Sequence, residues 1–546
     1  MNTGGRGMKV LKGISCVFFV LYASLFLGVA AFGQNADDSY QELLKLYQEF
    51  NEFRRPEVVD GVPDYSPVAI QAKKRGLESF RNRLSQIPQE KWTVSQKIDY
   101  FLVRAKLDEL DFQLRVTRPW ERDPGTYVDM IARIPYTTTP VSEGSEENLQ
   151  NRLKTVTKIL GKAKANLTDV SKTLADITIR RLEQSDGVNQ GEPRRDVPPE
   201  GVIGWYKDFL GRLEKHHPEL KADASQALSS VENYRDWLVA NRSRMTAPVS
   251  IGLDNYNWYL KNVRLMPYMV EDVLLIAEAE LSRTLAFLRI EQHRNRHLPQ
   301  LEPAKTAEEH ERRVREAEML VRSFIQEHDL LTIPDYMPSQ FETDAFWIVR
   351  PGGKRHFWEE ITYRDPLNNH IHASIPGHRF DNLIQRRNIN PIRGRYGDGG
   401  RAEGWAFYLE EMFLQAGLLD ERPRTRELFY IAQLKRVLRA PTEIKLQTGE
   451  FTLDQAIQFL KNEVPYMDEN LARYDLQIYL RQPAYGMTYL AGKVQFEKLL
   501  SDRARQLGED FDLGKFHDEF LAAGSIPITL IRWEMTGLDD EIKKLW

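Results

Sequence analysis

Three of the chain's eleven histidines, His370, His372 and His378, fall within nine residues around a Pro-Gly pair. Neutral imidazoles and carboxylates are the ligands that zinc uses in catalytic sites, where three protein ligands leave one position open for water. Zinc lowers the pKa of that water to about 7, and a nearby carboxylate can then accept its proton. The segment is therefore a candidate for metal binding and hydrolysis.

The spacing of His372 and His378 differs from that of the familiar zinc helix, which places two histidines four residues apart on one face. Side chains six apart on an ideal helix point about 240° from each other, at about 100° per residue. Pro376 and Gly377 must therefore break the helix if both histidines are to reach one metal, because an internal proline lacks a backbone donor and clashes with the preceding turn. The alternative is a pair of histidines on a surface loop.

Carboxylates follow about 25 residues later in the segment RAEGWAFYLEE, residues 401–411. Its pattern predicts an amphipathic helix that offers Glu403, Glu410 and Glu411. A carboxylate from a second helix is a common third zinc ligand.

These two blocks resemble a bacterial family of exported helical proteins called domain of unknown function 885. That family has the motif His-Glu-x-x-Pro-Gly-His-His, followed some 25 residues later by Glu-Gly-Trp-Ala. The matching residues are His372, Pro376, Gly377 and His378 in the first block and Glu403, Gly404, Trp405 and Ala406 in the second. Upstream IGLDNYNWYLKNV and downstream PAYGMTYLAGK and FDLGKFHDEFLAAGSIPITLI also resemble family segments, so the resemblance extends over most of the chain.

The family is related to zinc metallopeptidases of the glutamate-zincin kind. The resemblance therefore implies a zincin-like fold and a zinc ion held by His372, His378 and Glu403. The resemblance implies a divergent member, because Ala373 occupies the position of the motif glutamate, the expected general base. Arg379 replaces the second histidine of the His-His pair.

Further departures lie downstream. Polar or proton-handling residues of the family are replaced there by Gln447, Phe451, Ile478 and Tyr485. The family residues that are kept are Tyr479, Pro483, Tyr489 and Gly492. The implied metal ligands are thus kept, and several of their partners are not.

The first hypothesis is an exported zinc-dependent hydrolase, peptidase or amidase-like, with a variant active site. A positioned acid or base typically contributes about 10²–10⁴-fold to the rate, so another group has to replace the glutamate missing at Ala373. The nearby groups that offer this chemistry are Glu410, Glu411, Asp398 and His370, with Tyr485 or Tyr489 to stabilise the oxyanion. We select Glu410, Tyr485 and Tyr489 as catalytic candidates. Each also has a simpler interpretation, as a solvated helix carboxylate or a packed tyrosine.

The alternative hypothesis is a catalytically inactive pseudo-peptidase that acts as an exported binding protein. Arginines between or beside the two blocks are Arg386, Arg387, Arg393, Arg395 and Arg401. Guanidinium groups near a metal suit a peptide or another small anionic ligand, and we assign Arg379 and Arg401 to substrate binding. A solvated basic loop explains most of these arginines equally well. In a third hypothesis there is no metal, and the Pro-Gly segment serves folding only.

The elements that position these residues are predicted to be mainly α-helical. Apolar residues spaced three and four apart predict one helical stripe through Leu153, Val156, Leu160, Ala163, Leu167, Val170, Leu174 and Ile177. Helices are also predicted at 271–289 and 307–325, which are rich in good helix formers. The segments 345–353 and 357–365 predict a short hairpin before the histidines. We expect one large α-helical domain over residues 34–546, or two lobes connected by the Pro- and Gly-rich loop at 185–204.

The N-terminus has the pattern of a secretory signal peptide. Arg6, Lys9 and Lys12 precede an apolar run, and Ala31-Phe32-Gly33 forms a cleavage site. We expect residues 1–33 to be removed and the protein to be periplasmic or extracellular, the alternative being an uncleaved anchor. The only cysteine, Cys16, lies in this segment, so the mature chain has no thiol chemistry. No later segment is apolar for long enough to span a bilayer, and a net charge of −4 gives no reason to expect nucleic acid.

Overall fold

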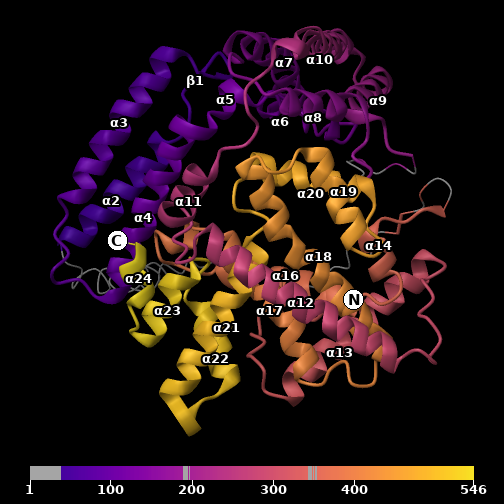
Figure 1. Cartoon of the computed structure of the whole chain (residues 1–546). Coiled ribbons are helices and arrows are strands. Elements are labelled where there is room, and N and C mark those ends of the chain that lie inside the picture. Colours follow the sequence, from indigo (N-terminus) through magenta and orange to yellow (C-terminus); the bar gives the residue numbers. More distant parts are fainter. Residues whose placement is uncertain are drawn as a thin grey trace, which may run out of the picture.

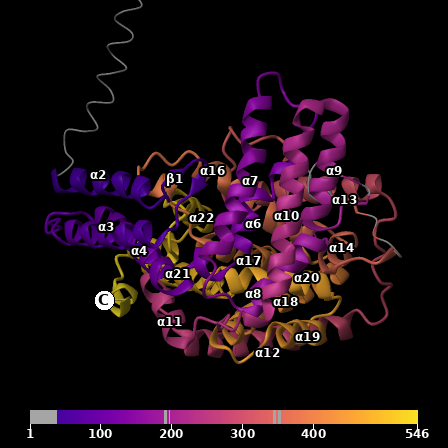
Figure 2. The ribbon, with the colours of Figure 1, turned by 90° about the horizontal axis from the view of Figure 1, so that it is seen from above.

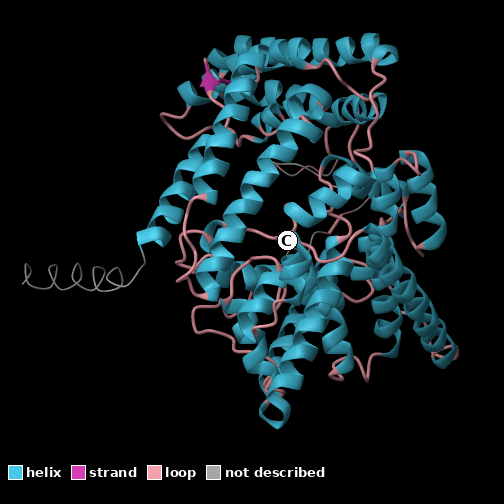
Figure 3. Ribbon diagram, turned by 60° about the vertical axis from the view of Figure 1, so that its left-hand side comes forward, coloured by secondary structure: helices cyan, strands magenta, loops and turns pink. Residues whose placement is uncertain are grey.

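Helices make up nearly all of the regular structure (Figure 3). The structure is a computed structural model that describes residues 38–188, 193, 195, 197–341, 347, 348, 350 and 353–545. Within these residues the strands are β1 (Val58–Val59) and β2 (Val62–Pro63), which pair antiparallel. The prediction of a mainly α fold with little β structure is confirmed.

The first half of the chain forms two groups of helices, both visible in Figure 1. The N-terminal group consists of α2 (Asp38–Phe53), α3 (Pro67–Ser85) and α4 (Val94–Phe112). The second group, here called the upper helices, consists of α5 (Pro119–Arg122), α6 (Gly125–Ile131), α7 (Glu146–Asn166), α8 (Lys172–Glu183), α9 (Gly201–His216) and α10 (Lys221–Asn241). The upper helices share a hydrophobic cluster of their own, which includes Leu153, Phe209 and Tyr234.

The second half of the chain builds most of the large core. Its first helices are α11 (Leu253–Asn262), α12 (Val270–Arg294), α13 (Ala307–Glu327), α14 (Phe357–Thr362), α15 (Leu367–Ala373), α16 (His378–Gln385) and α17 (Gly399–Gln415). The remaining ones are α18 (Pro423–Thr448), α19 (Leu453–Glu463), α20 (Glu469–Arg481), α21 (Thr488–Leu507), α22 (Leu513–Ala522), α23 (Ile528–Thr536) and α24 (Asp540–Leu545). These helices share their hydrophobic core with α2, α3 and α4. Whether the chain is one domain or two lobes stays a prediction.

The apolar stripe from Leu153 to Ile177 is buried as predicted, but it does not lie on one helix. α7 ends at Asn166, and α8 begins after Ser171, whose hydroxyl accepts the Leu174 N–H at 3.1 Å. The part of the stripe up to Val170 belongs to the cluster of the upper helices, whereas Leu174 and Ile177 belong to the large core. The prediction of a single helix was wrong because the chain turns between two cores here without losing its apolar spacing.

Of the other predicted elements, two helices are confirmed and one strand is wrong. The helices predicted at 271–289 and 307–325 are confirmed as α12 and α13. The second arm of the predicted hairpin is wrong, since its residues form α14, capped by His356, whose Nδ1 accepts the Glu359 N–H. Most of the first arm, residues 345, 346, 349, 351 and 352, lies outside the described residues.

The predicted loop at 185–204 is shorter than expected, because α9 begins at Gly201. Residues 189–192, 194 and 196 of this loop lie outside the described residues, as does the predicted signal peptide. In the described part of the chain, no helix has the length and apolar character needed to cross a bilayer.

α17 crosses the middle of the large core and is not amphipathic as predicted, because it is buried around almost its whole circumference. It packs directly on α21 through glycines. A Cβ atom on Gly404 would lie 2.4 Å from the carbonyl carbon of Gly492, and one on Gly492 would lie 2.1 Å from the carbonyl oxygen of Gly400. The absence of side chains at these positions lets the two backbones touch, which fixes the place of Glu403 one residue before Gly404.

Candidate metal centre

His372 and His378 lie on two short helices joined by a tight turn. α15 ends one residue after His372, and α16 begins at His378 after a cis peptide bond before Pro376. Gly377 is needed in this turn because a Cβ atom on it would lie 1.9 Å from the carbonyl oxygen of His372. The indole N–H of Trp405 donates to the Pro376 carbonyl at 3.0 Å and ties the turn to α17. The predicted break between the two histidines is confirmed.

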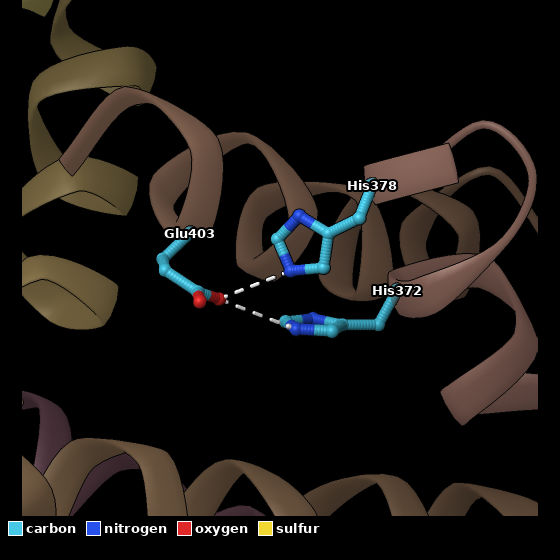
Figure 4. A group of neighbouring side chains, drawn as sticks. All are labelled: His372, His378 and Glu403. Atoms are coloured by element: carbon cyan, nitrogen blue, oxygen red, sulfur yellow. Dashed lines mark hydrogen bonds and ion pairs between the residues drawn. The ribbon is translucent and has the colours of Figure 1, made fainter. Parts of the chain in front are cut away.

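Three side chains from α15, α16 and α17 converge at this turn (Figure 4). Nε2 of His378 lies 3.2 Å, and Nε2 of His372 lies 3.5 Å, from the same carboxylate oxygen, Oε2 of Glu403. One ligand atom from each of the three residues lies within 4.8 Å of the other two. The structure thus brings together the three residues that the resemblance implied as ligands.

The two distances from the histidines to Glu403 fit a tetrahedral metal site. Ligand atoms about 2.1 Å from a zinc ion at tetrahedral angles are about 3.4 Å apart, and the two distances to Glu403 are 3.2 and 3.5 Å. Two imidazoles and one carboxylate are also a donor set of catalytic zinc sites. The same distances suit imidazole–carboxylate hydrogen bonds in a metal-free protein, so bound metal has to be measured.

Glu403 is an anion in the interior. Burial raises its pKa, but hydrogen bonds and charge from His372 and His378 outweigh burial and hold the pKa of Glu403 well below its usual value. Burial alone would lower the pKa of His378, but the Glu403 carboxylate more than compensates, so that the pKa of His378 is raised. The centre therefore presents a carboxylate that attracts positive charge, which a metal cation would supply.

Glu410 lies behind His372, on the far side of the imidazole from Glu403. Its Oε1 is 2.7 Å from Nδ1 of His372 and 2.8 Å from a guanidinium nitrogen of Arg436, and its Oε2 accepts a hydrogen bond from Asn368 at 2.8 Å. Carboxylates in this place orient metal-binding histidines and fix their tautomer. Glu410 thus contacts His372 and Arg436, and its assignment as a catalytic residue stays a prediction.

Both predicted tyrosines border the three ligands. The Tyr485 hydroxyl donates to Oε1 of Glu403 at 3.4 Å. The ring of Tyr489 is parallel to that of His372, with centroids 6.2 Å apart and 5° between the planes. Burial is the main cause that raises the pKa of each phenol, and the Glu403 charge adds to it. Both hydroxyls therefore keep their protons at neutral pH and can donate hydrogen bonds.

The assignment of Arg401 to substrate binding was wrong. Its side chain is 0% exposed, forms an ion pair with Asp381 and lies over the ring of Phe520, 4.8 Å from the centroid. Residues two apart on a helix point about 200° from each other, which turns Arg401 away from the side of α17 that carries Glu403. Arg379 is half-buried at the start of α16, and its assignment stays a prediction.

The other proposed proton acceptors have partners elsewhere. Glu411 receives two hydrogen bonds from Arg283, at 2.7 and 2.8 Å. Asp398 caps the first turn of α17. Nε2 of His370 lies 3.2 Å from a carboxylate oxygen of Glu318.

Sequence reasoning missed a group of buried cations on α18. Lys435 and Arg439 lie 2.6 and 3.3 Å from Asp475, and burial is the main cause that lowers the pKa of Lys435 to about 7. The Arg439 guanidinium lies over the Tyr489 ring at 4.1 Å, while Arg436 contacts Glu410 as described above. The signal that could have found them is the presence of three cations inside an otherwise apolar helical run.

Comparison with known proteins finds a family match over part of the chain and no activity. Residues 339–535 match the family model described as "Bacterial protein of unknown function (DUF885)". A comparison with curated proteins found no match.

Two solved structures share the fold. A "putative lipoprotein of unknown function" from Shewanella oneidensis has a TM-score of 0.70 at 16% identity and covers 92% of this chain and 100% of its own. A "putative lipoprotein" from Colwellia psychrerythraea has a TM-score of 0.68 at 14% identity and covers 91% of this chain and 99% of its own. The matched segment, residues 339–535, contains both motif blocks, so over this part the chain is similar to a bacterial family of unknown function.

Proposed function

We propose that the protein is an exported metal-dependent hydrolase of peptides or related amides, with zinc held by His372, His378 and Glu403. The observation that carries the proposal is the convergence of three ligand atoms from three helices, at distances of 3.2 and 3.5 Å to the Glu403 oxygen. The carboxylate of Glu410 behind His372 supports it, because metal-binding histidines nearly always have such a partner. A relationship to glutamate-zincin peptidases is part of the same proposal.

The residues around the centre have separate roles in this proposal. Bound zinc would supply Lewis acidity for water and for a scissile carbonyl. Glu410 orients His372, while Tyr485 and Tyr489 donate hydrogen bonds to negative charge that develops on the substrate. Among the described residues, Glu410 and Glu411 are both tied to cations, so neither replaces the general base missing at Ala373.

The missing base favours a second candidate, a pseudo-peptidase that binds its ligand without hydrolysis. The same ligand set would then anchor the ligand through the metal. Turnover separates the two candidates, and metal binding is common to both.

Export belongs to the proposal as well. The two structural neighbours are described as lipoproteins, which supports an exported protein. For this chain we propose a periplasmic or extracellular location after cleavage of the segment up to residue 33.

The test is the metal content of the purified mature protein, measured by mass spectrometry after incubation with zinc and gel filtration. We expect about one zinc ion per chain in the wild type and much less in His372→Ala and Glu403→Ala, since three ligands are the usual protein contribution. His370→Ala is the matched control, because His370 lies on the same helix and contacts Glu318 instead of the three ligands.

Circular dichroism of each variant shows whether the fold is kept. Wild-type protein that retains no zinc would refute both metal-dependent candidates. Zinc that remains after both ligand substitutions would place the metal elsewhere.

A further inference from the structure

A groove of about 660 Å³ runs between the upper helices and α20. One wall comes from α6, α8 and α9, and the other from α20 and the residue that follows it, Gln482. Figures 1 and 2 both show the upper helices beside α20. The groove lies outside the metal centre described above and has no role in it so far.

The α20 wall is a continuous stripe of polar and aromatic side chains. The residues of α20 that line the groove include Asn470, Arg473, Tyr474, Gln477 and Arg481. They recur at intervals of three and four, so they share one face of the helix, and the opposite face is buried. From Asn470 to Arg481 the helix rises about 16 Å, at 1.5 Å per residue, which is the length of about five residues of extended peptide.

The charges of the groove favour an anion. Arg481 binds Asp123 and Asp129 at 2.5 Å each, and Arg181 binds Asp129 at 2.5 Å, so both aspartates already have arginine partners. Arg133 and Arg180 also line the groove, and neither makes an ion pair with any carboxylate in the described part of the chain. In total, five arginines and three aspartates line a groove in a chain whose net charge is −4.

A short segment connects the α20 wall of the groove to the metal centre. Gln482 is the last residue along the chain that lines the groove. Tyr485, three residues later, donates to Glu403 at 3.4 Å. Three residues span at most about 10 Å, so a chain that follows α20 towards its C-terminal end comes within a few residues' length of Glu403.

We propose that this groove binds an extended peptide with an acidic side chain, which Arg180 recognises. The guanidinium of Arg180 is half-buried and suits a carboxylate. Side-chain amides such as that of Gln477 both donate and accept hydrogen bonds, as the backbone of a bound peptide requires. Tyr136 packs on Trp205, with 5.0 Å between the ring centroids, and offers an aromatic wall. This inference rests on the proposed function, because it names the class of substrate.

The test is peptide binding by metal-free protein, which needs no turnover. The probes are a fluorescein-labelled octapeptide of alanine and serine with one central glutamate, and its glutamine counterpart, measured by fluorescence anisotropy. We expect the glutamate peptide to bind about fivefold tighter or more, and Arg180→Gln to remove this preference, as loss of a charge-assisted contact should. Arg244→Gln is the matched control, because Arg244 is an exposed arginine outside the groove.

Equal affinity for the two peptides, no binding of either, or an unchanged preference in Arg180→Gln would overturn the inference. Displacement of the peptide by a lower concentration of oligogalacturonate would also overturn it and identify an acidic glycan as the occupant. The outcomes separate from those of the proposed function, since peptide binding by a protein that retains no zinc in the metal-content test would leave the groove assigned and refute only the metal centre.

Discussion

Replacing Glu410 by glutamine tests whether this buried carboxylate positions His372. Glu410 is 0% exposed and contacts His372 at 2.7 Å and Arg436 at 2.8 Å. Glu410→Gln keeps the size of the side chain and removes its charge. Loss of such a partner behind a metal ligand typically weakens metal affinity about 10–100-fold, which corresponds to about 1.4–2.7 kcal/mol. We expect a zinc Kd raised by this factor, with the stoichiometry unchanged.

The same substitution leaves Arg436 without its carboxylate in an environment where the Arg436 side chain is 1% exposed. Removing one partner of a buried ion pair costs about 3–5 kcal/mol, so we expect metal-free Glu410→Gln to unfold at clearly lower urea concentration. The double variant Glu410→Gln/Arg436→Met should recover much of this loss, because no unpaired charge remains. Its zinc affinity should stay low.

The assay is a competition titration with a fluorescent zinc chelator, together with urea unfolding of the metal-free proteins. Wild-type zinc affinity in Glu410→Gln would refute the positioning role. A double variant that is no more stable than Glu410→Gln would refute the ion-pair argument.

Three further predictions follow from other parts of the structure. Ala373→Glu restores the motif glutamate, and we expect the rate of peptide hydrolysis by zinc-loaded protein to rise about 10²–10⁴-fold. The assay measures the amines that hydrolysis releases, and an unchanged rate would favour the binding protein. Gly404→Ala places a Cβ atom 2.4 Å from the backbone of Gly492. We therefore expect the free energy of unfolding, measured with urea, to fall by about 1–3 kcal/mol, and zinc binding to weaken. The control is Gly211→Ala, whose Cβ atom meets nothing within 4 Å and should not destabilise the protein. Burial is the main cause that lowers the pKa of His517 to about 4, while the unfolded value is about 6.5. As the pH falls, His517 therefore binds a proton in the unfolded chain before it does so in the folded protein. The free energy of unfolding is not reduced by this effect above pH 6.5, and it falls by up to about 3 kcal/mol as the pH approaches 4. Urea midpoints of wild type and His517→Gln between pH 8 and pH 4.5 should converge as the pH falls, and parallel curves would contradict the assignment.

The metal centre and the groove together describe a binding site that extends beyond the ligand set. Each part is tested by a separate experiment, because peptide binding to metal-free protein and zinc binding to peptide-free protein are independent measurements. The Arg180 variant changes specificity, and the Glu410 variant changes metal affinity.

The amino-acid sequence alone determined the helical class and named the three residues that converge in the structure. Apolar spacing predicted α12 and α13 because the buried residues of each helix recur at helical intervals. His372, His378 and Glu403 could be named because residue types and intervals within one short region carried a family motif. Pro376 and Gly377 predicted the break between the histidines, since proline has no backbone donor.

Only the tertiary structure decided what each neighbouring charge does. Glu410 and Glu411 are adjacent in the sequence, yet one faces His372 and the other Arg283. Arg401 appeared available to a substrate, but Asp381 neutralises it inside the core. Likewise, the groove is bounded by helices about 300 residues apart in the chain. Sequence pattern reports the periodicity of a segment, whereas a charge in the interior is defined by partners that distant helices bring within a few ångströms.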